Sequence, residues 1–182
     1  DAWDEKYLGE QIKAHPLIKD KDRHKAERPF RLACIQLATY DGTVYNVKKV
    51  MEKIGHLCDY VLWDEAWIGY NAFHPLFHDH SPMHLENLGP QSPGLFSTQS
   101  VHKQGAGFSQ ASQIHKRDEH IKGQKRFIEH KRFNESFLQH ASTSPFYPLF
   151  ASLDVNAKVH AGKAGEALWD RCIELGIETR KR

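Results

Sequence analysis

The chain has 182 residues and a formal net charge of +2, from 25 lysines and arginines against 23 aspartates and glutamates. This near-balance gives no electrostatic case for a nucleic-acid partner. The mean hydropathy of -0.64, with no apolar run near 18 residues, argues against a membrane span and predicts a soluble protein. The length favours a single domain around one core.

Three cysteines, Cys34, Cys58 and Cys172, lie far apart in apolar segments and form no short-spaced motif. The sequence therefore predicts reduced thiols buried in the core. Reduced cysteines are typical of a reducing compartment, so a cytoplasmic location is expected.

The first half of the chain reads as a helix, a strand, a helix and a strand. Residues 1–29 are charged and contain two prolines, which predicts a surface helix with a connector. Residues 31–38 form an apolar run expected to be a strand covered on both faces. After Asn46, a suitable N-cap, an apolar stripe predicts a helix, and residues 60–63 return to strand character. This βαβ pattern makes the two strands parallel and places Asp64 at a strand's carboxyl end.

The second half begins with a loop rich in histidine and proline over residues 74–93. Two further strands are expected at 94–100 and 109–115, and three helices at 124–140, 146–161 and 164–178. The last helix should bury the stripe formed by Ala164, Leu168, Cys172 and Leu175. The fold class is therefore α/β, with a mixed, mostly parallel sheet flanked by helices.

Lys103 lies between the third expected strand and a loop broken by Gly105 and Gly107. An amine at such a position can act as a nucleophile when burial beside cationic groups lowers its pKa, and the neighbouring His102 is one candidate. This chemistry fits pyridoxal phosphate (PLP), whose aldehyde is held by a lysine as a Schiff base.

Asp64 is the candidate partner of the PLP ring nitrogen. Ligands of open α/β sheets bind outside the carboxyl ends of the strands, where Asp64 is expected. A carboxylate about 4 Å from a protonated pyridine gains about 4 kcal/mol before desolvation is subtracted. That charge would make the ring a stronger electron sink.

Hydroxyl and imidazole groups near Lys103 are candidate phosphate donors. Ser100 and His102 alternate with Val101 near the end of a strand, which predicts that both point to one face. Ser142, Thr143 and Ser144 precede Pro145, which suits the first turn of the next helix. Ala66 and Trp67 follow Asp64 and are candidates to pack on the cofactor.

Each of these features has a plainer interpretation when taken singly. A lysine before a glycine is usually solvated, and an aspartate after a strand is commonly a turn former. Ser-Thr-Ser-Pro also starts helices that bind no ligand. The order and context of the whole set favour the functional interpretation.

Several longer motifs carry a resemblance to a known family. They are Arg-Pro-Phe-Arg-Leu-Ala at 28–33, Thr-Tyr-Asp-Gly-Thr-Val-Tyr-Asn at 39–46, Asp-Glu-Ala-Trp at 64–67, Phe-Ser-Gln-Ala-Ser-Gln-Ile-His-Lys at 108–116 and His-Ala-Ser-Thr-Ser-Pro-Phe-Tyr-Pro-Leu-Phe at 140–150. From about Arg28 onward the chain resembles the bacterial ornithine, lysine and arginine decarboxylases, which are PLP enzymes of fold type I.

The resemblance implies specific roles for the candidate residues. Lys103 would be the Schiff-base lysine and Asp64 the pyridine partner, while Ala66 and Trp67 would belong to the cofactor surroundings. The remaining cofactor contacts would be Ser100, His102 and Ser144, the last donated across a homodimer interface. Within this family, Ser-Val-His-Lys-Gln at 100–104 and Asp-Val-Asn-Ala-Lys at 154–158 look like the ornithine branch. The implied reaction is conversion of L-ornithine to putrescine and carbon dioxide; lysine and arginine decarboxylation stay open as alternatives.

The resemblance also implies a domain organisation. Residues 1–29 would be a charged helix and connector, and residues 30–182 the second half of a large, aspartate aminotransferase-type PLP domain. Its first half, with further phosphate and ring contacts, would precede residue 1, and a C-terminal domain would follow residue 182. Such a piece is expected to be inactive in isolation.

Two alternatives come from other classes of protein. His74, His78, His80 and His84 have spacings at which imidazoles can ligate a transition metal, although Pro75 and Pro82 interrupt them. A non-catalytic scaffold that keeps the fold is the second alternative. The group that would recognise the distal amine of a substrate is not evident, although Glu65 and Glu135 are acids near the motifs.

Overall fold

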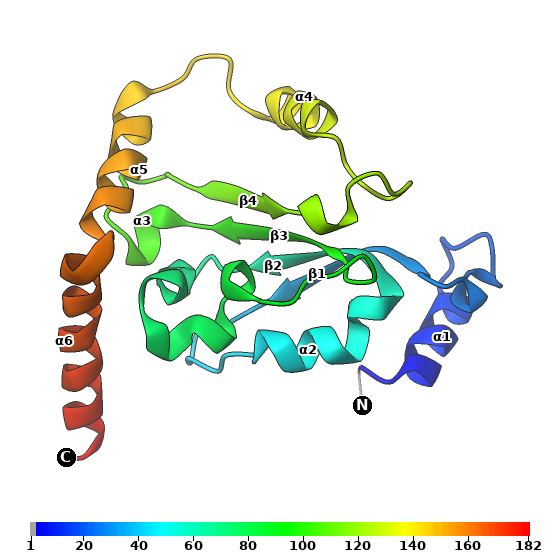
Figure 1. Ribbon diagram of the computed structural model, residues 1–182, viewed down its shortest axis with the longest axis horizontal. Helices are drawn as coiled ribbons and strands as arrows, with labels where there is room; N and C mark the ends of the chain where they lie inside the picture. The colour runs from blue at the N-terminus through cyan, green and yellow to red at the C-terminus, as the bar shows by residue number, and fades with distance from the viewer. Residues whose placement is uncertain (1–2) are drawn as a thin grey trace.

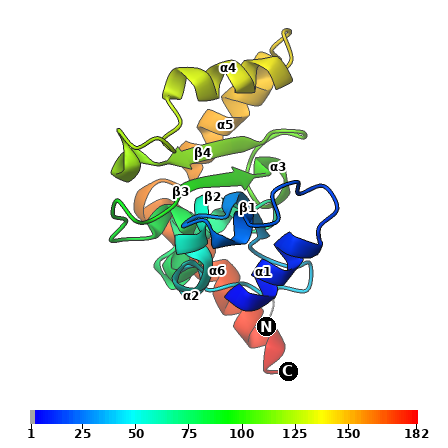
Figure 2. The same ribbon diagram turned by 90° about the vertical axis from the view of Figure 1, so that its right-hand side faces the viewer.

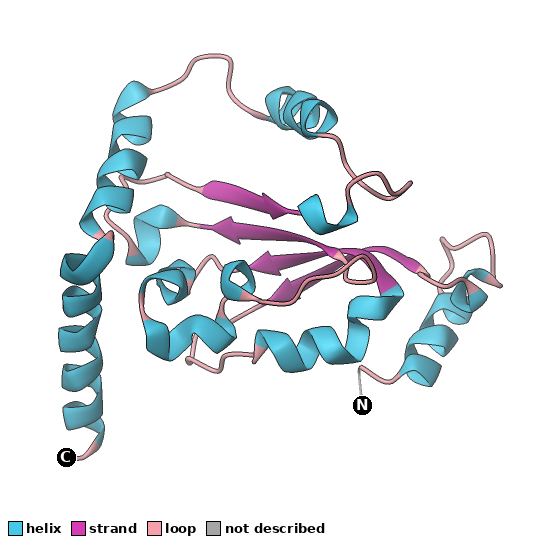
Figure 3. Ribbon diagram, viewed as in Figure 1, coloured by secondary structure: helices cyan, strands magenta, loops and turns pink. Residues whose placement is uncertain are grey.

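The computed structural model describes residues 3–182 as one α/β unit (Figure 1). Short 3₁₀ helices fill much of the chain between the main elements (Figure 3). The main elements are α1 (Glu5–Ala14), β1 (Phe30–Gln36), α2 (Val47–Ile54), β2 (Cys58–Asp64), β3 (Gly94–Gln99), α3 (Val101–Gln104), β4 (Gln113–Arg117), α4 (His130–His140), α5 (Tyr147–Val159) and α6 (Gly162–Arg180).

The four strands form one sheet in the order β1-β2-β3-β4. The first three strands are parallel, and β4 is antiparallel to β3. The carboxyl ends of β1, β2 and β3 therefore meet at one edge, which faces α3 and α5 in Figure 1. The expected mixed, mostly parallel α/β fold is confirmed, and so is the position of Asp64 at the last residue of β2.

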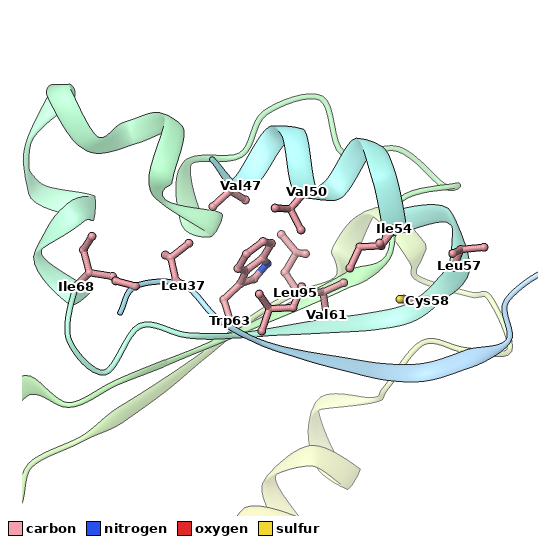
Figure 4. Close-up of a cluster of buried hydrophobic side chains, with 12 residues drawn as sticks. Leu37, Val47, Val50, Ile54, Leu57, Cys58, Val61, Trp63, Ile68 and Leu95 are labelled. Carbon is pink, nitrogen blue, oxygen red and sulfur yellow. The ribbon is translucent and has the colours of Figure 1, made fainter. Parts of the chain in front are cut away.

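The βαβ unit forms as its sequence predicts. The side chain of Asn46 accepts a hydrogen bond of 3.0 Å from the Lys49 amide and caps α2. The apolar face of α2 then packs on the sheet against Val61, Trp63 and Leu95 (Figure 4). Burial of these side chains is the main force that holds the crossover on this face.

The opposite face of the sheet carries a smaller cluster of Tyr60, Phe96 and Ile121, against which Phe133 of α4 packs. This face is only partly covered. Leu32 of β1 remains 45% exposed, so the prediction that the first strand is covered on both faces is wrong. Within residues 3–182, β1 is an edge strand, with no further strand beside it and little packed over its outer face.

Two element boundaries differ from those predicted. The fourth strand begins at Gln113, four residues later than expected, and α4 begins at His130 instead of near 124. Residues 119–121 form a short 3₁₀ helix, and Gly123 turns with a φ of +83°. Phe127 and Ile128 then pack on the second core cluster, which keeps this stretch out of the helix.

Helices α5 and α6 run along one side of the molecule in Figure 1 and lie behind the sheet in the view of Figure 2. The predicted buried stripe of α6 is wrong, because Leu168 is 56% and Leu175 45% exposed, and Ala164 and Cys172 are exposed as well. The side that contacts the body of the protein is shifted by one residue to Gly165 and Trp169. Trp169 stacks on Tyr70 with ring centroids 4.3 Å apart, and this aromatic contact sets the rotation of the helix.

All three cysteines are free, as expected. Only Cys58 is buried, so the prediction of a core position is wrong for Cys34 and Cys172, which lie on the open face of β1 and on the exposed side of α6. No helix within residues 3–182 is long and apolar enough to cross a membrane.

Candidate functional site

Asp64 ends β2 with an exposed carboxylate at the carboxyl edge of the sheet. Its Oδ1 atom accepts a hydrogen bond of 2.9 Å from the Ala66 amide, which fixes the carboxylate at the start of the turn. Thr98 of β3 lies directly across from Asp64 in the parallel register. The sequence Asp-Glu-Ala-Trp thus presents a fixed negative charge where α/β sheets bind ligands.

The segment of Ser100 to Lys103 follows β3 at the same edge. The strand ends at Gln99, and Ser100 caps the single helical turn α3, so the strand alternation expected for Ser100 and His102 does not hold. The His102 Nδ1 atom donates a hydrogen bond of 2.8 Å to the Ala111 carbonyl, which leaves Nε2 as the ring nitrogen not used in this bond. Lys103 is exposed, in contrast to the expected burial.

Trp67 links the two segments. The Nζ atom of Lys103 lies 4.3 Å from the centroid of the Trp67 ring, a cation-π contact. On the same indole, the ring of Tyr40 packs at a centroid distance of 4.7 Å. Because Trp67 follows Asp64 by three residues, this contact brings the predicted amine and the predicted carboxylate to one place on the sheet edge.

The loop that follows Lys103 is held by α5. The buried side chain of Asn156 accepts a hydrogen bond of 2.8 Å from the Ala106 amide, and Ser152 accepts one of 3.0 Å from the Phe108 amide. A Cβ atom on Gly105 would meet Asn156 Oδ1 at 2.6 Å, so this approach needs glycine. Asn156 belongs to the motif at 154–158, which therefore orders the loop beside the candidate lysine.

Ser144 lies apart from this group. It occupies the exposed loop between α4 and α5, where its amide donates 3.1 Å to the Ser142 hydroxyl. The helix that follows begins at Tyr147, with Pro148 and not Pro145 in its first turn and no hydroxyl cap. The structure of this chain brings Asp64, Ala66, Trp67, Ser100, His102 and Lys103 to one edge, and Ser144 to a surface loop.

Sequence reasoning missed a buried polar network behind this edge. Glu65 is fully buried, and its carboxylate accepts hydrogen bonds from the side chains of Asn71, Ser97 and Gln99. Burial raises the pKa of the Glu65 carboxyl, and the three hydrogen bonds partly offset this rise. Glu65, one of the two acids noted near the motifs, therefore has its carboxylate engaged inside the fold. Its alternation with Val61 and Trp63 was the signal of burial.

The histidine loop offers no comparable site. His74 pairs with Asp170 at 2.9 Å, His80 bonds the Tyr45 carbonyl, and His84 bonds that of Ala72. In the part of the chain described, no group of three or more histidine, cysteine or acidic side chains is placed to hold a metal ion. These rings are used in packing this loop against its neighbours.

The model of one protein family, "Orn/Lys/Arg decarboxylase, major domain", matches residues 1–182. The chain belongs to the Orn/Lys/Arg decarboxylase family. It is 59% identical over 182 residues to the constitutive ornithine decarboxylase of Escherichia coli, covering 99% of this chain and 25% of that protein. The ornithine decarboxylase of Haemophilus influenzae is 59% identical over 180 residues, with 99% and 24% covered. The chain thus spans about a quarter of the length of these curated relatives.

The names of more distant members of the family refer to other amino acids. The lysine decarboxylase LdcA of Pseudomonas aeruginosa and the biodegradative arginine decarboxylase of E. coli are each 35% identical over 174 residues, covering 96% of this chain and 22% of each protein. The crystal structure of the Francisella novicida lysine decarboxylase LdcF superposes with a TM-score of 0.81 at 30% identity, over 99% of this chain and 22% of that one.

Proposed function

We propose that this chain is part of a PLP-dependent decarboxylase that converts L-ornithine to putrescine and carbon dioxide, a step of polyamine metabolism. The observation that carries the proposal is the meeting of Lys103 and Trp67 beside Asp64 at the carboxyl edge of the sheet. The choice of ornithine rests on the identities of 59% to ornithine decarboxylases against 35% to the lysine and arginine enzymes.

The residues at the edge fit PLP in their chemistry. The cofactor needs an amine, a negative charge for its ring nitrogen, donors for its phosphate and an apolar wall. Lys103 offers an accessible amine, and Asp64 offers a carboxylate that is oriented by the Ala66 amide. The indole of Trp67 offers the wall, already in contact with the Lys103 ammonium.

When bound, PLP supplies an electron sink for the electron pair that stays on Cα as carbon dioxide leaves. The work of this chain is to hold and orient the reacting groups. Lys103 would hold the cofactor through its amine. Asp64 would face the ring nitrogen, where its negative charge would favour the protonated form of that nitrogen.

Ser100 and His102 are proposed to bind the cofactor's phosphate and ring surroundings from the turn after β3. The bond from Nδ1 to the Ala111 carbonyl orients the His102 ring and leaves Nε2 available, so His102 is also proposed to assist proton movement near Lys103. Ser144 is proposed to reach a phosphate in a second copy of the chain, within a cytoplasmic homodimer. Its exposure in a surface loop supports a contact outside its own chain.

The proposed domain assignment rests on the resemblance to the family and is supported by the chain's covering about a quarter of its relatives. Residues 30–182 are proposed to be the second half of the PLP-binding large domain, after a charged helix and connector at 1–29. Because other walls of the pocket would come from the rest of the protein, the isolated chain is proposed to be inactive.

The proposal is tested with the full-length protein by measuring carbon dioxide release from ornithine, lysine and arginine. We expect kcat/KM to favour ornithine by about 100-fold, because a site built around one distal amine leaves polar groups unpaired with another chain length. A preference for lysine or arginine contradicts the substrate assignment. Activity that survives removal of PLP contradicts the whole proposal.

A further inference from the structure

The buried carboxylate of Glu65 lies at the junction of the two strands that carry the candidate site. Glu65 directly follows Asp64, and Gln99 directly precedes Ser100. The Gln99 amide donates 2.9 Å to Glu65 Oε2, and the Ser97 hydroxyl donates to the same oxygen. A single carboxylate oxygen therefore joins the end of β2 to the end of β3.

The network extends beyond these two strands. The side-chain amide of Asn71 donates a hydrogen bond of 2.9 Å to Glu65 Oε1 and one of 2.7 Å to the His80 carbonyl. These bonds connect the loop that follows Trp67 to the network. On the other side, Gln99 Oε1 accepts bonds from two side chains of β4, at 2.7 Å from Gln113 and 3.2 Å from His115. Three strands and one loop thus share one chain of hydrogen bonds.

The network supports the site from behind. Side chains alternate across a strand, so Glu65, Ser97 and Gln99 face the α2 side of the sheet, where Val61 and Trp63 also lie. Asp64 and Thr98 face the other way. Asp64, the candidate partner of the ring nitrogen, and the groups of the network are therefore on opposite faces of the sheet.

Burying a carboxylate in a core costs free energy unless both of its oxygens accept hydrogen bonds. An apolar side chain would pack here without that requirement, but it would not specify the distance between the strand ends. A fully connected polar network does specify geometry, because each bond has a narrow range of lengths and angles.

We propose that Glu65 is a positioning residue: its buried carboxylate fixes the ends of β2 and β3 relative to each other and so sets the spacing of Asp64 and Lys103. This inference rests on the proposed function. The cofactor would bind across that spacing, since the carboxylate and the amine serve opposite ends of one rigid ring system. A small displacement of a positioned group costs a large factor in rate.

The test uses the full-length protein with Glu65→Gln, which keeps the volume and removes the charge and one acceptor. Asp118→Asn is the matched control, because Asp118 is a buried acid at the opposite edge of the sheet, bonded to Tyr60 and Lys116. The readouts are kcat and KM for the substrate, the dissociation constant of PLP from titration of the apoenzyme, and the thermal unfolding midpoint.

For Glu65→Gln we expect kcat to fall about tenfold or more and the PLP dissociation constant to rise, with KM changed less than kcat. Asp118→Asn should lower the unfolding midpoint and leave kcat and PLP affinity unchanged. The double variant Glu65→Gln with Gln99→Glu returns a carboxylate to the network and should restore much of kcat. If Glu65→Gln does not fold, Ser97→Ala removes a single donor and should lower kcat at an unfolding midpoint near that of the unchanged protein.

The inference is overturned if Glu65→Gln keeps the kcat and PLP affinity of the unchanged protein, or if both variants lose only stability. A double variant that regains stability without kcat overturns it as well. These results would leave the decarboxylase proposal standing. If the unchanged protein binds no PLP, the proposed function fails, and the inference fails with it.

Discussion

The Lys103 ammonium rests 4.3 Å from the centroid of the Trp67 ring, three residues beyond Asp64. Through this contact the Trp67 ring connects the Lys103 amine to the turn that carries the Asp64 carboxylate. Replacing Trp67 by alanine removes both the wall and an exposed cation-π contact that contributes about 1 kcal/mol. We expect PLP to bind about fivefold more weakly, and Trp67→Phe to lose much less. Titration of the full-length apoenzyme measures this, and equal losses in both variants would contradict it.

Asp64→Asn keeps the acceptor for the Ala66 amide and removes the negative charge. Because the side chain is exposed in this structure, folding should change little. We expect kcat to fall about 100-fold, in the range seen when one electrostatic stabiliser is removed from an active site. Asp64→Glu keeps the charge but displaces it, so its kcat should lie between those of the unchanged protein and Asp64→Asn. Steady-state kinetics of the unchanged protein and the two variants measure this. An Asp64→Asn variant with the kcat of the unchanged protein would exclude Asp64 as the partner of the ring nitrogen.

Glu65 makes stability depend on pH. Burial holds the pKa of its carboxyl above the ordinary glutamate value in the folded protein, so the folded state takes up the proton more readily than the unfolded state. Its contribution to stability is therefore fully present below the unfolded pKa and is lost as the pH rises through the folded pKa. Glu65→Gln removes this dependence.

Thermal unfolding from about pH 4 to about pH 8 compares the two proteins. The unfolding midpoint of the unchanged protein, relative to Glu65→Gln, should fall as the pH rises. A difference that is constant, or that grows with pH, would show that the folded pKa is not raised.

Cys58 should be a protected thiol. It is buried, and burial raises its pKa to about 11 from an ordinary value of 9.0. At neutral pH its thiolate fraction is therefore about 100-fold smaller than that of an ordinary cysteine, and alkylation should slow by at least that factor. Peptide-resolved mass spectrometry after timed labelling measures the rate. Labelling of Cys58 as fast as in the unfolded protein would contradict the assignment.

The βαβ unit was predictable because its signals are local. Asn46 caps α2, the apolar stripe matches the helical period, and Asp64 ends the strand that follows. The position of the candidate site at the carboxyl edge of the sheet was predictable from the parallel direction of these strands. The same reasoning could not locate Lys103 over Trp67, since that contact joins residues 36 positions apart through a turn whose shape is set by α5.

The failures have a common physical cause. Leu168, Leu175 and Leu32 were predicted to be buried because they are apolar and periodic, but about half of each side chain is exposed. Periodicity shows which residues share a face and does not show what covers that face. The burial of Glu65 was not predicted, although its alternation with Val61 and Trp63 places it on the covered face.

The chain contains four His-Lys pairs, which end in Lys25, Lys103, Lys116 and Lys131. Lys25 and Lys131 form surface ion pairs with Asp22 and Glu135. Lys116 donates 2.5 Å to Asp118 and 3.1 Å to the Ile128 carbonyl at the far edge of the sheet, so its amine is engaged in the fold. Lys103 is accessible at the edge where ligands bind. The central claim is therefore that PLP is held by Lys103.

The most direct test adds PLP to the full-length protein, reduces the complex with borohydride and maps the modified lysine by mass spectrometry. The predicted result is one PLP group per chain on Lys103. Lys103→Arg, which keeps the positive charge over Trp67 but lacks the amine chemistry, should carry none. Modification of Lys116 or of surface lysines with Lys103 unmodified, or no stable uptake of PLP, would contradict the account.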